Sequence, residues 1–295
     1  MLSTTLFHAM AELGYEGLVL CEPEDTYLSL GYFDYAPQLI DVQKCKSLGI
    51  GIIRRRIGGG AVLLAPGQVF YQFILPKRLV PFKVEDAYRK LSEPVIRAYG
   101  RLGVEVVYRP INDLVVKKSQ RKISGQGAGD IGKYFVFVGN VLVDFSPELM
   151  AELFAAPEGL RHLLRESLQE NLSWLKRELG KNLSFEEVAS ILLEEFSKDF
   201  ELEVSHEAPE PALEYAEKLR LEMTSEDTLM EDTGRRHKFI KIREGVYVRL
   251  LRGGAGLVIK DGIVVHAEGF KGANELIGKA YDDKLEELIY PHLGA

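Results

Sequence analysis

The spacing of hydrophobic residues predicts helices and strands in alternation along the first half of the chain. Residues 1–15 repeat apolar side chains at helical intervals, and residues 84–103 form a longer amphipathic stretch that contains Pro94. Short segments rich in β-branched and aromatic residues, bounded by Gly, Pro or Asp, predict strands. These segments cover residues 18–23, 26–33, 50–56, 61–76 and 134–145, and we expect the last to be a central hairpin.

The pattern becomes helical from residue 147 to about residue 200 and then changes again. Residues 206–219 hold two prolines and several acidic side chains, and their start is interpreted as a linker between domains. Alternating strands with a Lys-Asp-Gly turn at 260–262 follow, and a helix is predicted at 274–290. We therefore expect an α+β fold of mixed β-sheets flanked by helices, with a larger N-terminal domain at 1–205 and a small α+β domain at 206–295.

Composition narrows the class of protein. The 295 residues are 46% apolar and 27% charged, which is typical of a globular chain, and 37 basic against 44 acidic residues give a net charge of −7. A general affinity for nucleic acid is therefore not expected. The absence of a basic leader and of an apolar run of about 18 residues predicts a cytoplasmic protein with no membrane span. Two cysteines and six scattered histidines predict neither a disulfide framework nor a metal cluster.

The first segment with potential chemistry is RRRIGGGAV at residues 54–62. Arginines at a strand end present guanidinium groups to phosphate or carboxylate, and three glycines leave backbone N–H groups bare for a ligand. The alternative is a flexible hairpin tip with solvated arginines. The apolar strands predicted on both sides favour the anion site.

The second segment is NDLVVKKSQRKISGQGAG at residues 112–129. Lys122 stands at the lip of a glycine-rich turn predicted at 123–132, although a plain surface lysine fits the same pattern. Asn112 and Asp113 follow a proline, where they would orient the turn or contact a nucleotide. The G-x-G-x-x-G spacing in this segment precedes a strand rather than a helix, so a dinucleotide site is not predicted, and no P-loop motif is present.

Taken together, these segments resemble the lipoate–protein ligase A family of the biotin/lipoate A/B protein ligase superfamily. The likeness is specific over residues 26–145, through the RRRIGGGAV and NDLVVKKSQRKISGQG blocks, and it is looser toward residue 200. HKFIKIREGVYVRL at residues 237–250 resembles the family's C-terminal accessory domain. The resemblance implies an enzyme that uses ATP and Mg²⁺ to convert lipoate to lipoyl-AMP and passes the acyl group to a lysine of an acceptor protein.

The resemblance also implies the roles of individual residues. Lys122 corresponds to the family's essential lysine, which contacts the acyl carbonyl and the α-phosphate. The other implied positions, which would bind the substrate or the adenylate, are Arg55, Gly58, Gly59, Gly60, Ala61, Gln68, Asn112, Asp113, Ser124, Gly125 and Gly139. Ile57 before the glycines and Leu64-Ala65 after them depart from the family pattern and make the acyl pocket more apolar. Lipoate and octanoate both remain open as substrates.

Three alternatives stay beside the ligase hypothesis. An octanoyl or lipoyl transferase of the same fold would act without ATP through a cysteine thioester, but Cys21 and Cys45 both precede the glycine motif. A biotin ligase would carry a G-R-G-R-x-G-R loop, which is absent, and a non-catalytic binding relative would have no use for Lys122. The implied partner is a lipoyl acceptor: the lipoyl domain of a 2-oxoacid dehydrogenase acyltransferase, a glycine-cleavage H protein or an H-like lipoate carrier.

Overall fold

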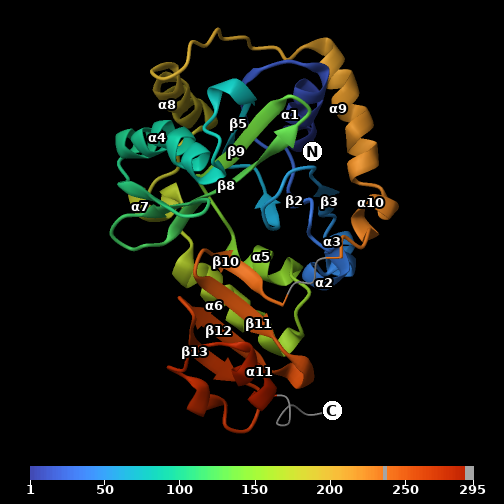
Figure 1. The fold of residues 1–295 in the computed structure, drawn as a ribbon, viewed down its shortest axis with the longest axis vertical. Helices are drawn as coiled ribbons and strands as arrows, with labels where there is room; N and C mark the ends of the chain where they lie inside the picture. The colour runs from blue at the N-terminus through green and yellow to red at the C-terminus, as the bar shows by residue number, and fades with distance from the viewer. Residues whose placement is uncertain (235–237, 290–295) are drawn as a thin grey trace.

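A computed structural model describes residues 1–234 and 238–289, and its largest element is a six-stranded antiparallel sheet. The strand order is β1-β5-β9-β8-β7-β6. The strands are β1 (Gly17–Cys21), β5 (Gln68–Pro76), β6 (Val106–Arg109), β7 (Asp113–Val116), β8 (Lys122–Ile131) and β9 (Tyr134–Leu142). Helices α4 (Val84–Leu102) and α8 (Phe185–Ser197) cover one face, where Tyr99, Phe137 and Phe196 are buried together (Figure 1). Helix α1 (Leu2–Leu13) packs on Ile74 and Val136 of the same sheet.

A smaller sheet lies beside the first and has the order β3-β2-β4. Its strands are β2 (Tyr27–Leu30), β3 (Gly51–Arg54) and β4 (Val62–Leu64), with β2 parallel to β3 and antiparallel to β4. Leu28 and Leu63 of this sheet are buried with Leu153 and Leu164 from the helices that cover it. The neighbouring helices are α2 (Ala36–Leu39), α3 (Val42–Ser47), α5 (Pro147–Leu153), α6 (Arg161–Asn171) and α7 (Leu175–Leu179), with the short 3-10 helices η1 (Lys77–Leu79) and η2 (Glu158–Leu160).

The C-terminal module is a four-stranded antiparallel sheet of order β10-β11-β12-β13. It comprises β10 (Ile240–Arg243), β11 (Val246–Leu250), η3 (Arg252–Gly254), β12 (Gly256–Lys260), β13 (Ile263–Glu268), η4 (Ala273–Leu276) and α11 (Asp283–Ile289). Ile242 and Val248 of this sheet share one hydrophobic core with Leu160 and Leu163 at α6. The module is therefore joined to the rest of the molecule by buried apolar contact as well as by the chain (Figure 1).

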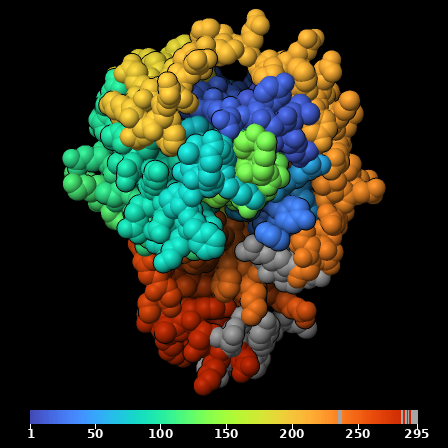
Figure 2. All heavy atoms as spheres, turned by 45° about the horizontal axis from the view of Figure 1, so that its top comes forward, coloured from blue at the N-terminus to red at the C-terminus, as the bar shows by residue number. Residues whose placement is uncertain are grey.

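Helix α9 (Glu210–Met223), which precedes the short α10 (Glu226–Met230), packs against α1 and not against the C-terminal sheet. Its buried residues Ala216, Leu219 and Met223 lie with Ala9 of α1. Figure 2 shows the orange atoms of this helix beside the blue atoms of the N-terminus. The predicted domain boundary at residues 205 and 206 stays a prediction, and the segment that follows it lies on the N-terminal side of the molecule.

Most predicted elements are confirmed, including the long helix with Pro94 inside it. The strand segment predicted at 61–76 forms two strands, β4 and β5, on either side of Pro66-Gly67. The predicted turn at 123–132 is wrong, because these residues form the ten-residue strand β8. Strand β8 makes the hairpin with β9, so residues 134–145 supply one of its strands and not both. The predicted helix at 274–290 is also wrong. Gly278 has a φ of +87° between η4 and α11, a backbone conformation that ends a helix, and Tyr290 lies outside the described residues.

The described residues include no helix that is both long enough and apolar enough to cross a bilayer.

Candidate active site

The two glycine-rich motifs meet at a cavity of about 180 Å³ between the sheets. Gly59 and Gly60 of the first motif and Gly125 and Gly127 of the second line it. A side-chain carbon on Gly127 would lie 3.3 Å from the carbonyl oxygen of Gly58, which is tighter than nearly all real contacts of this kind. The absence of side chains therefore lets the loop at residues 57–60 lie directly on strand β8.

Arg55 holds this loop in place from beneath. Its guanidinium donates to the carbonyl oxygens of Ser29 at 2.8 Å, Gly60 at 2.8 Å and Gly58 at 3.2 Å. Burial lowers the pKa of Arg55, and the nearby carboxylate of Asp34 opposes that shift. Most of its hydrogen-bonding capacity is thus directed at the backbone, although the side chain also forms part of the cavity wall.

The other two arginines of the triplet also bind protein groups. Arg54 donates to the carbonyl oxygens of Leu229 at 2.8 Å and Glu231 at 3.2 Å, which attaches the chain after α10 to β3. Arg56 pairs with Glu12 of α1 and, at 2.6 Å, with Glu222 of α9. The expectation that three arginines present themselves to a ligand is therefore wrong for Arg54 and Arg56, because tertiary contacts satisfy their guanidinium groups.

Lys122 is the central cation of the site. Its ammonium nitrogen lies 2.9 Å from Oδ1 of Asp113, whose carboxyl is fully buried. The second oxygen of Asp113 accepts a hydrogen bond of 2.8 Å from the backbone N–H of Glu244 in the C-terminal module. Burial alone would raise the pKa of Asp113, but Lys122 and the Glu244 amide outweigh it, so the pKa lies below its ordinary value. The pair is therefore ionised, and the lysine is held as a fixed positive charge.

Gly125 leaves room for that lysine. A side-chain carbon at Gly125 would stand 3.0 Å from both Cε and Nζ of Lys122. The backbone N–H of Gly125 donates to Oδ1 of Asn140 at 3.1 Å, which ties strand β8 to strand β9 at this point. The conformation of Lys122 thus depends on the absence of a side chain at Gly125.

Buried polar side chains support the cavity wall behind Lys122. The hydroxyl of Tyr71 lies 3.3 Å from that of Ser124 and accepts from the amide of Gln126 at 3.1 Å. Gly139 faces the Tyr71 ring, where any side chain would clash with the phenol. The side chain of Asn112 donates to the carbonyl oxygen of Gln126 at 2.6 Å.

Away from Lys122 the cavity is lined by hydrophobic side chains, which suits an alkyl chain. They come from α1, both N-terminal sheets and helices α5 and α6, and they are Phe7, Val62, Leu63, Leu64, Phe70, Val138, Leu142, Phe145, Met150, Phe154, Leu168 and Leu172. A cationic end and an apolar body together fit an amphiphilic acid or acyl derivative.

The predicted site residues fall into two groups by position. Those that line the cavity are Arg55, Gly59, Gly60, Ala61, Asn112, Lys122, Gly125 and Gly139. Gly58, Gln68, Asp113 and Ser124 stand behind this lining; Gln68, for example, donates to the carbonyl oxygen of Leu63 at 3.2 Å. Sequence reasoning missed Gly127 and most of the apolar wall, and it also missed the polar lining residues Thr4, Ser29, Gln72, Gln126, Asn140 and Lys241. Gln126 could have been found from its place directly after the predicted site residue Gly125.

Neither cysteine of the chain lines the cavity. Cys45 is buried in α3, and burial raises the pKa of its thiol to about 11. Cys21 lies at the end of β1 with its sulfur 3.9 Å from Oε1 of Gln72, and burial raises the pKa of its thiol to about 12. At neutral pH both remain thiols, and the reactive form of cysteine is the thiolate.

Comparison with known proteins decides the family. Residues 2–197 match the model of the lipoyl protein ligase A/B catalytic domain. The chain belongs to this family. The resemblance inferred from the glycine and lysine motifs is thereby confirmed, and the α+β fold with a C-terminal β domain agrees with it.

Relatives of this lipoyl protein ligase A/B family member differ in name. The octanoyltransferase LipM of Oceanobacillus iheyensis is 27% identical over 198 residues, which is 60% of this chain and 71% of the relative. In structure, the chain is similar to a bipartite lipoate protein ligase of Thermoplasma acidophilum, with a TM-score of 0.69 at 20% identity over 80% of this chain and 93% of that one. It is also similar to a lipoate-protein ligase A bound with ATP, with a TM-score of 0.64 at 19% identity over 78% and 94% of the two chains. The chain is therefore an enzyme of the lipoate ligase and transferase family.

Proposed function

We propose that the protein is an ATP-dependent lipoate–protein ligase that accepts lipoate or octanoate. In the first step a carboxylate oxygen of the acid attacks the α-phosphorus of ATP, the bond to pyrophosphate breaks, and an acyl-adenylate forms. In the second step a lysine amine of the acceptor protein attacks the acyl carbonyl, loses a proton and displaces AMP. Both steps gather negative charge on oxygen atoms near one point.

A fixed cation at that point serves both steps. Lys122 is held by Asp113 beside the bare glycine backbone, and it faces a cavity with an apolar body. An ammonium that is already in position stabilises the oxygens of the adenylation transition state and of the tetrahedral intermediate without reorganising at the moment of reaction.

The position of the cysteines is the observation that carries the ATP-dependent reaction. A transferase that works without ATP through an acyl-enzyme needs a nucleophile in the pocket, and a thiolate is the usual one for thioester exchange. The chain's two thiols are absent from the cavity lining, and burial keeps both protonated. Activation by ATP removes the need for such a nucleophile.

The names of the relatives favour a second candidate, transfer of an octanoyl group from an existing thioester. Several sequence relatives are octanoyltransferases, including one from Exiguobacterium sibiricum that is 36% identical over 110 residues. In that reaction the acceptor lysine would displace the thiol directly, with Lys122 stabilising the carbonyl oxygen. The acceptor would be the same in both candidates.

The cofactors and acceptor follow from the proposed reaction. ATP is the natural activator because a similar structure is that of a lipoate-protein ligase A bound with ATP. Mg²⁺ would arrive on the ATP phosphates, which are its usual ligands in nucleotide sites. The described residues hold no group of three or more His, Cys, Asp and Glu side chains suited to a metal. The acceptor would be a small lipoyl domain, since a structural relative was solved with its E2 lipoyl domain.

Two assays on the purified protein separate the candidates. The first measures exchange of labelled pyrophosphate into ATP in the presence of lipoate, octanoate or no acid. The second measures transfer of octanoate from an acyl-carrier-protein thioester to a lipoyl domain without ATP. We expect acid-dependent exchange, and this exchange should survive the double substitution of Cys21→Ser and Cys45→Ser.

Transfer from the thioester with no exchange under any acid would reject the ligase and support the octanoyltransferase. Loss of that transfer in the double cysteine variant would additionally assign the acyl-enzyme to a cysteine.

A further inference from the structure

The cavity wall is cationic, although the whole chain is acidic. Its charged lining residues are Arg55, Lys122 and Lys241, and no Asp or Glu of the described residues lines it. The net charge of the chain is −7, so the charge of the lining is opposite in sign to that of the whole chain. Arg55 is largely occupied by loop carbonyls, which leaves two lysines to meet a charged ligand.

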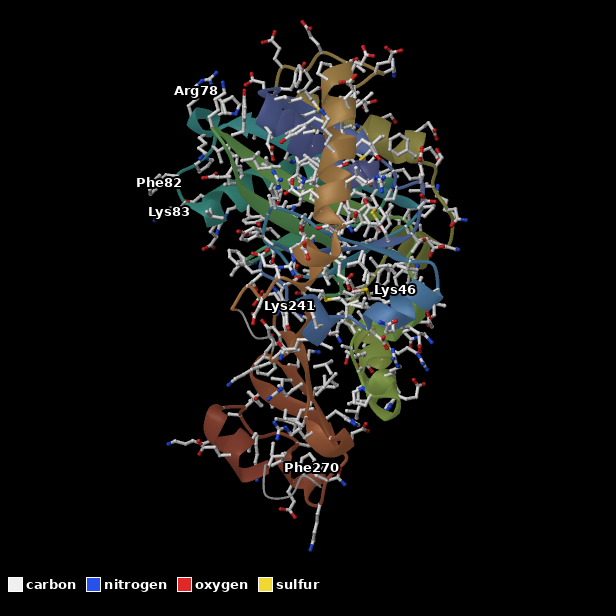
Figure 3. The ribbon with its side chains drawn as sticks, turned by 90° about the vertical axis from the view of Figure 1, so that its right-hand side faces the viewer. Lys46, Arg78, Phe82, Lys83, Lys241 and Phe270 are labelled. Atoms are coloured by element: carbon white, nitrogen blue, oxygen red, sulfur yellow. The ribbon has the colours of Figure 1, made fainter. Side chains whose placement is uncertain are left out.

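Lys241 reaches the cavity from a different part of the molecule than Lys122. It lies on strand β10, where the C-terminal sheet meets the rest of the fold (Figure 3). Its side chain is 39% exposed, and its ammonium pairs with Oε2 of Glu244 at 2.6 Å. A partly exposed lysine with one carboxylate partner keeps donors available for a ligand.

A hydrogen bond fixes the strand end that carries Lys241. The backbone N–H of Glu244 donates to Asp113 at 2.8 Å, and the same carboxylate binds Lys122 at 2.9 Å. A second contact between the same two parts of the molecule joins Arg109 to Asp261 at 3.1 Å. The two lysines are thus coupled through one buried carboxylate.

We propose that Lys241 is a substrate-binding residue of the active site, which contacts a phosphoryl group of the substrate together with Lys122. This assignment rests on the proposed function, but its chemistry is shared by both candidates, because ATP and the phosphopantetheine arm of an acyl thioester each carry phosphate. The side-chain carboxylate of Glu244 competes with the phosphoryl group for Lys241. The backbone N–H of Glu244, through its hydrogen bond to Asp113, positions the strand end that carries Lys241.

The test is equilibrium binding to the full-length protein by calorimetry, with ATP and with octanoyl-phosphopantetheine as separate probes. K241Q removes the charge and is expected to weaken binding of the phosphate-bearing probe about tenfold. K271Q is the matched control, because Lys271 is an exposed residue of the same module that does not line the cavity. Fluorescence of the single tryptophan, Trp174, checks that each variant is folded.

E244Q separates ligand binding from a merely structural ion pair. It keeps the backbone N–H but releases Lys241 from its carboxylate, so binding should become several-fold tighter. If Lys241 served only to pair with Glu244, both K241Q and E244Q would behave alike. Weaker binding by E244Q would therefore overturn the proposal.

The wild-type result distinguishes this proposal from the proposed function. Binding of ATP that K241Q leaves unchanged would refute the role of Lys241 while the ligase stands. Binding of octanoyl-phosphopantetheine but not of ATP would refute the ligase, and the same variants with that probe would then decide on Lys241. Binding of neither probe by the wild type would overturn both.

Discussion

Lys122 and Asp113 form a charged pair, and each side chain restricts the conformations that the other can adopt. The ammonium lies 2.9 Å from a fully buried carboxylate, which is itself anchored by the Glu244 amide. The lysine therefore cannot turn away from the cavity without leaving a buried negative charge unpaired, and that is costly.

Replacing this lysine should abolish most of the activity. We expect Lys122→Ala to lower the rate of acyl transfer about 10²- to 10³-fold, the usual cost of removing one donor to a developing oxyanion. Lys118→Ala is the control, because Lys118 is exposed in the turn between β7 and β8. Rates are measured with both variants at equal concentration, and circular dichroism compares their folds. Near-normal activity of Lys122→Ala would remove this residue from the chemistry.

His8 is a buried group whose protonation state is fixed by its partners. Its Nδ1–H donates to the carbonyl oxygen of Thr4 at 2.8 Å, and its Nε2 accepts from the backbone N–H of Arg56 at 3.1 Å. A second proton on the ring would face that N–H. Burial, and to a lesser extent the charges of Arg56 and Arg55, lower the pKa of His8 to about 3.

This histidine should make stability depend on pH. Between pH 6.5 and about pH 3 the unfolded chain binds a proton at His8 that the folded chain does not, so stability is complete above pH 6.5 and is lost as the pH falls. The expected loss from this group is about 2 kcal/mol at pH 5. Urea unfolding at pH 7 and pH 5 measures it. His8→Gln should reduce the pH dependence, whereas substitution of the exposed His206 should not; equal slopes in all three proteins would contradict the assignment.

The direction of a side chain is a feature that the sequence alone does not predict, and Arg55 is an example. The motif around Arg55 could be predicted from its arginines and glycines, but the direction of the guanidinium could not. It points at carbonyl oxygens because the loop of Gly58 and Gly60 curls over it, and that curvature comes from contact with strand β8. Lys122 was indicated by the family motif that contains it, since its local pattern alone fits a surface lysine as well.

At the level of elements, the site depends on close contact between three backbone segments. The loop before β4 meets the turn after β2 where Gly59 faces Gly31, and it meets strand β8 where Gly58 faces Gly127. A side-chain carbon on Gly31 would clash with the carbonyl oxygen of Gly59. Because the obstructing atom belongs to the backbone of Gly59, one of these two backbone segments would have to move.

Gly31→Ala should therefore displace the glycine loop. We expect a loss of about 1–3 kcal/mol in unfolding free energy, as for other overpacked sites, and a larger loss of activity. Gly100→Ala is the control, since Gly100 lies exposed in α4 with open space where the methyl group would stand; that change should stabilise the protein by up to about 1 kcal/mol. Chemical unfolding and activity are compared for both. A Gly31→Ala variant with normal activity would contradict the packing described above.

Strand β8 explains why one element could not be predicted. Its sequence, with glycine at 125, 127 and 129, is typical of a turn when it is considered alone. Pairing with β9 over six residues supplies the hydrogen bonds that make it a strand, and the glycines serve the loop that lies on it. Helix α8 was predictable because its capping box and its apolar spacing are local.

At the level of the whole molecule, the chain returns to its beginning before it forms the C-terminal sheet. Helix α9 buries Leu219 against α1, and only afterwards does the chain enter β10. Helix α9 thus contributes to the hydrophobic core of the N-terminal unit, despite following the predicted boundary. No local pattern indicates such a return.

Truncating that leucine should destabilise the N-terminal unit. We expect Leu219→Ala to cost about 2–5 kcal/mol, the usual range for a buried leucine. Leu221→Ala on the same helix is the control, because its side chain is 61% exposed and should change stability little. Fluorescence of Trp174, which lies in the N-terminal unit, follows unfolding in denaturant. Equal midpoints for the two variants would show that α9 is not part of this core.

The cavity is formed by the whole molecule, because its wall combines residues of α1, two sheets, α5, α6 and β10. Sequence reasoning found the residues that sit in motifs and missed Lys241 and Gln72, which gain their positions only through tertiary packing.

The raised pKa of both thiols has a consequence for handling the enzyme. With the pKa of Cys21 raised to about 12 and that of Cys45 to about 11, alkylating reagents and mild oxidants encounter almost no reactive sulfur at neutral pH. A catalyst that needs no sulfur nucleophile would keep turning over after iodoacetamide, under conditions that would silence an enzyme dependent on one.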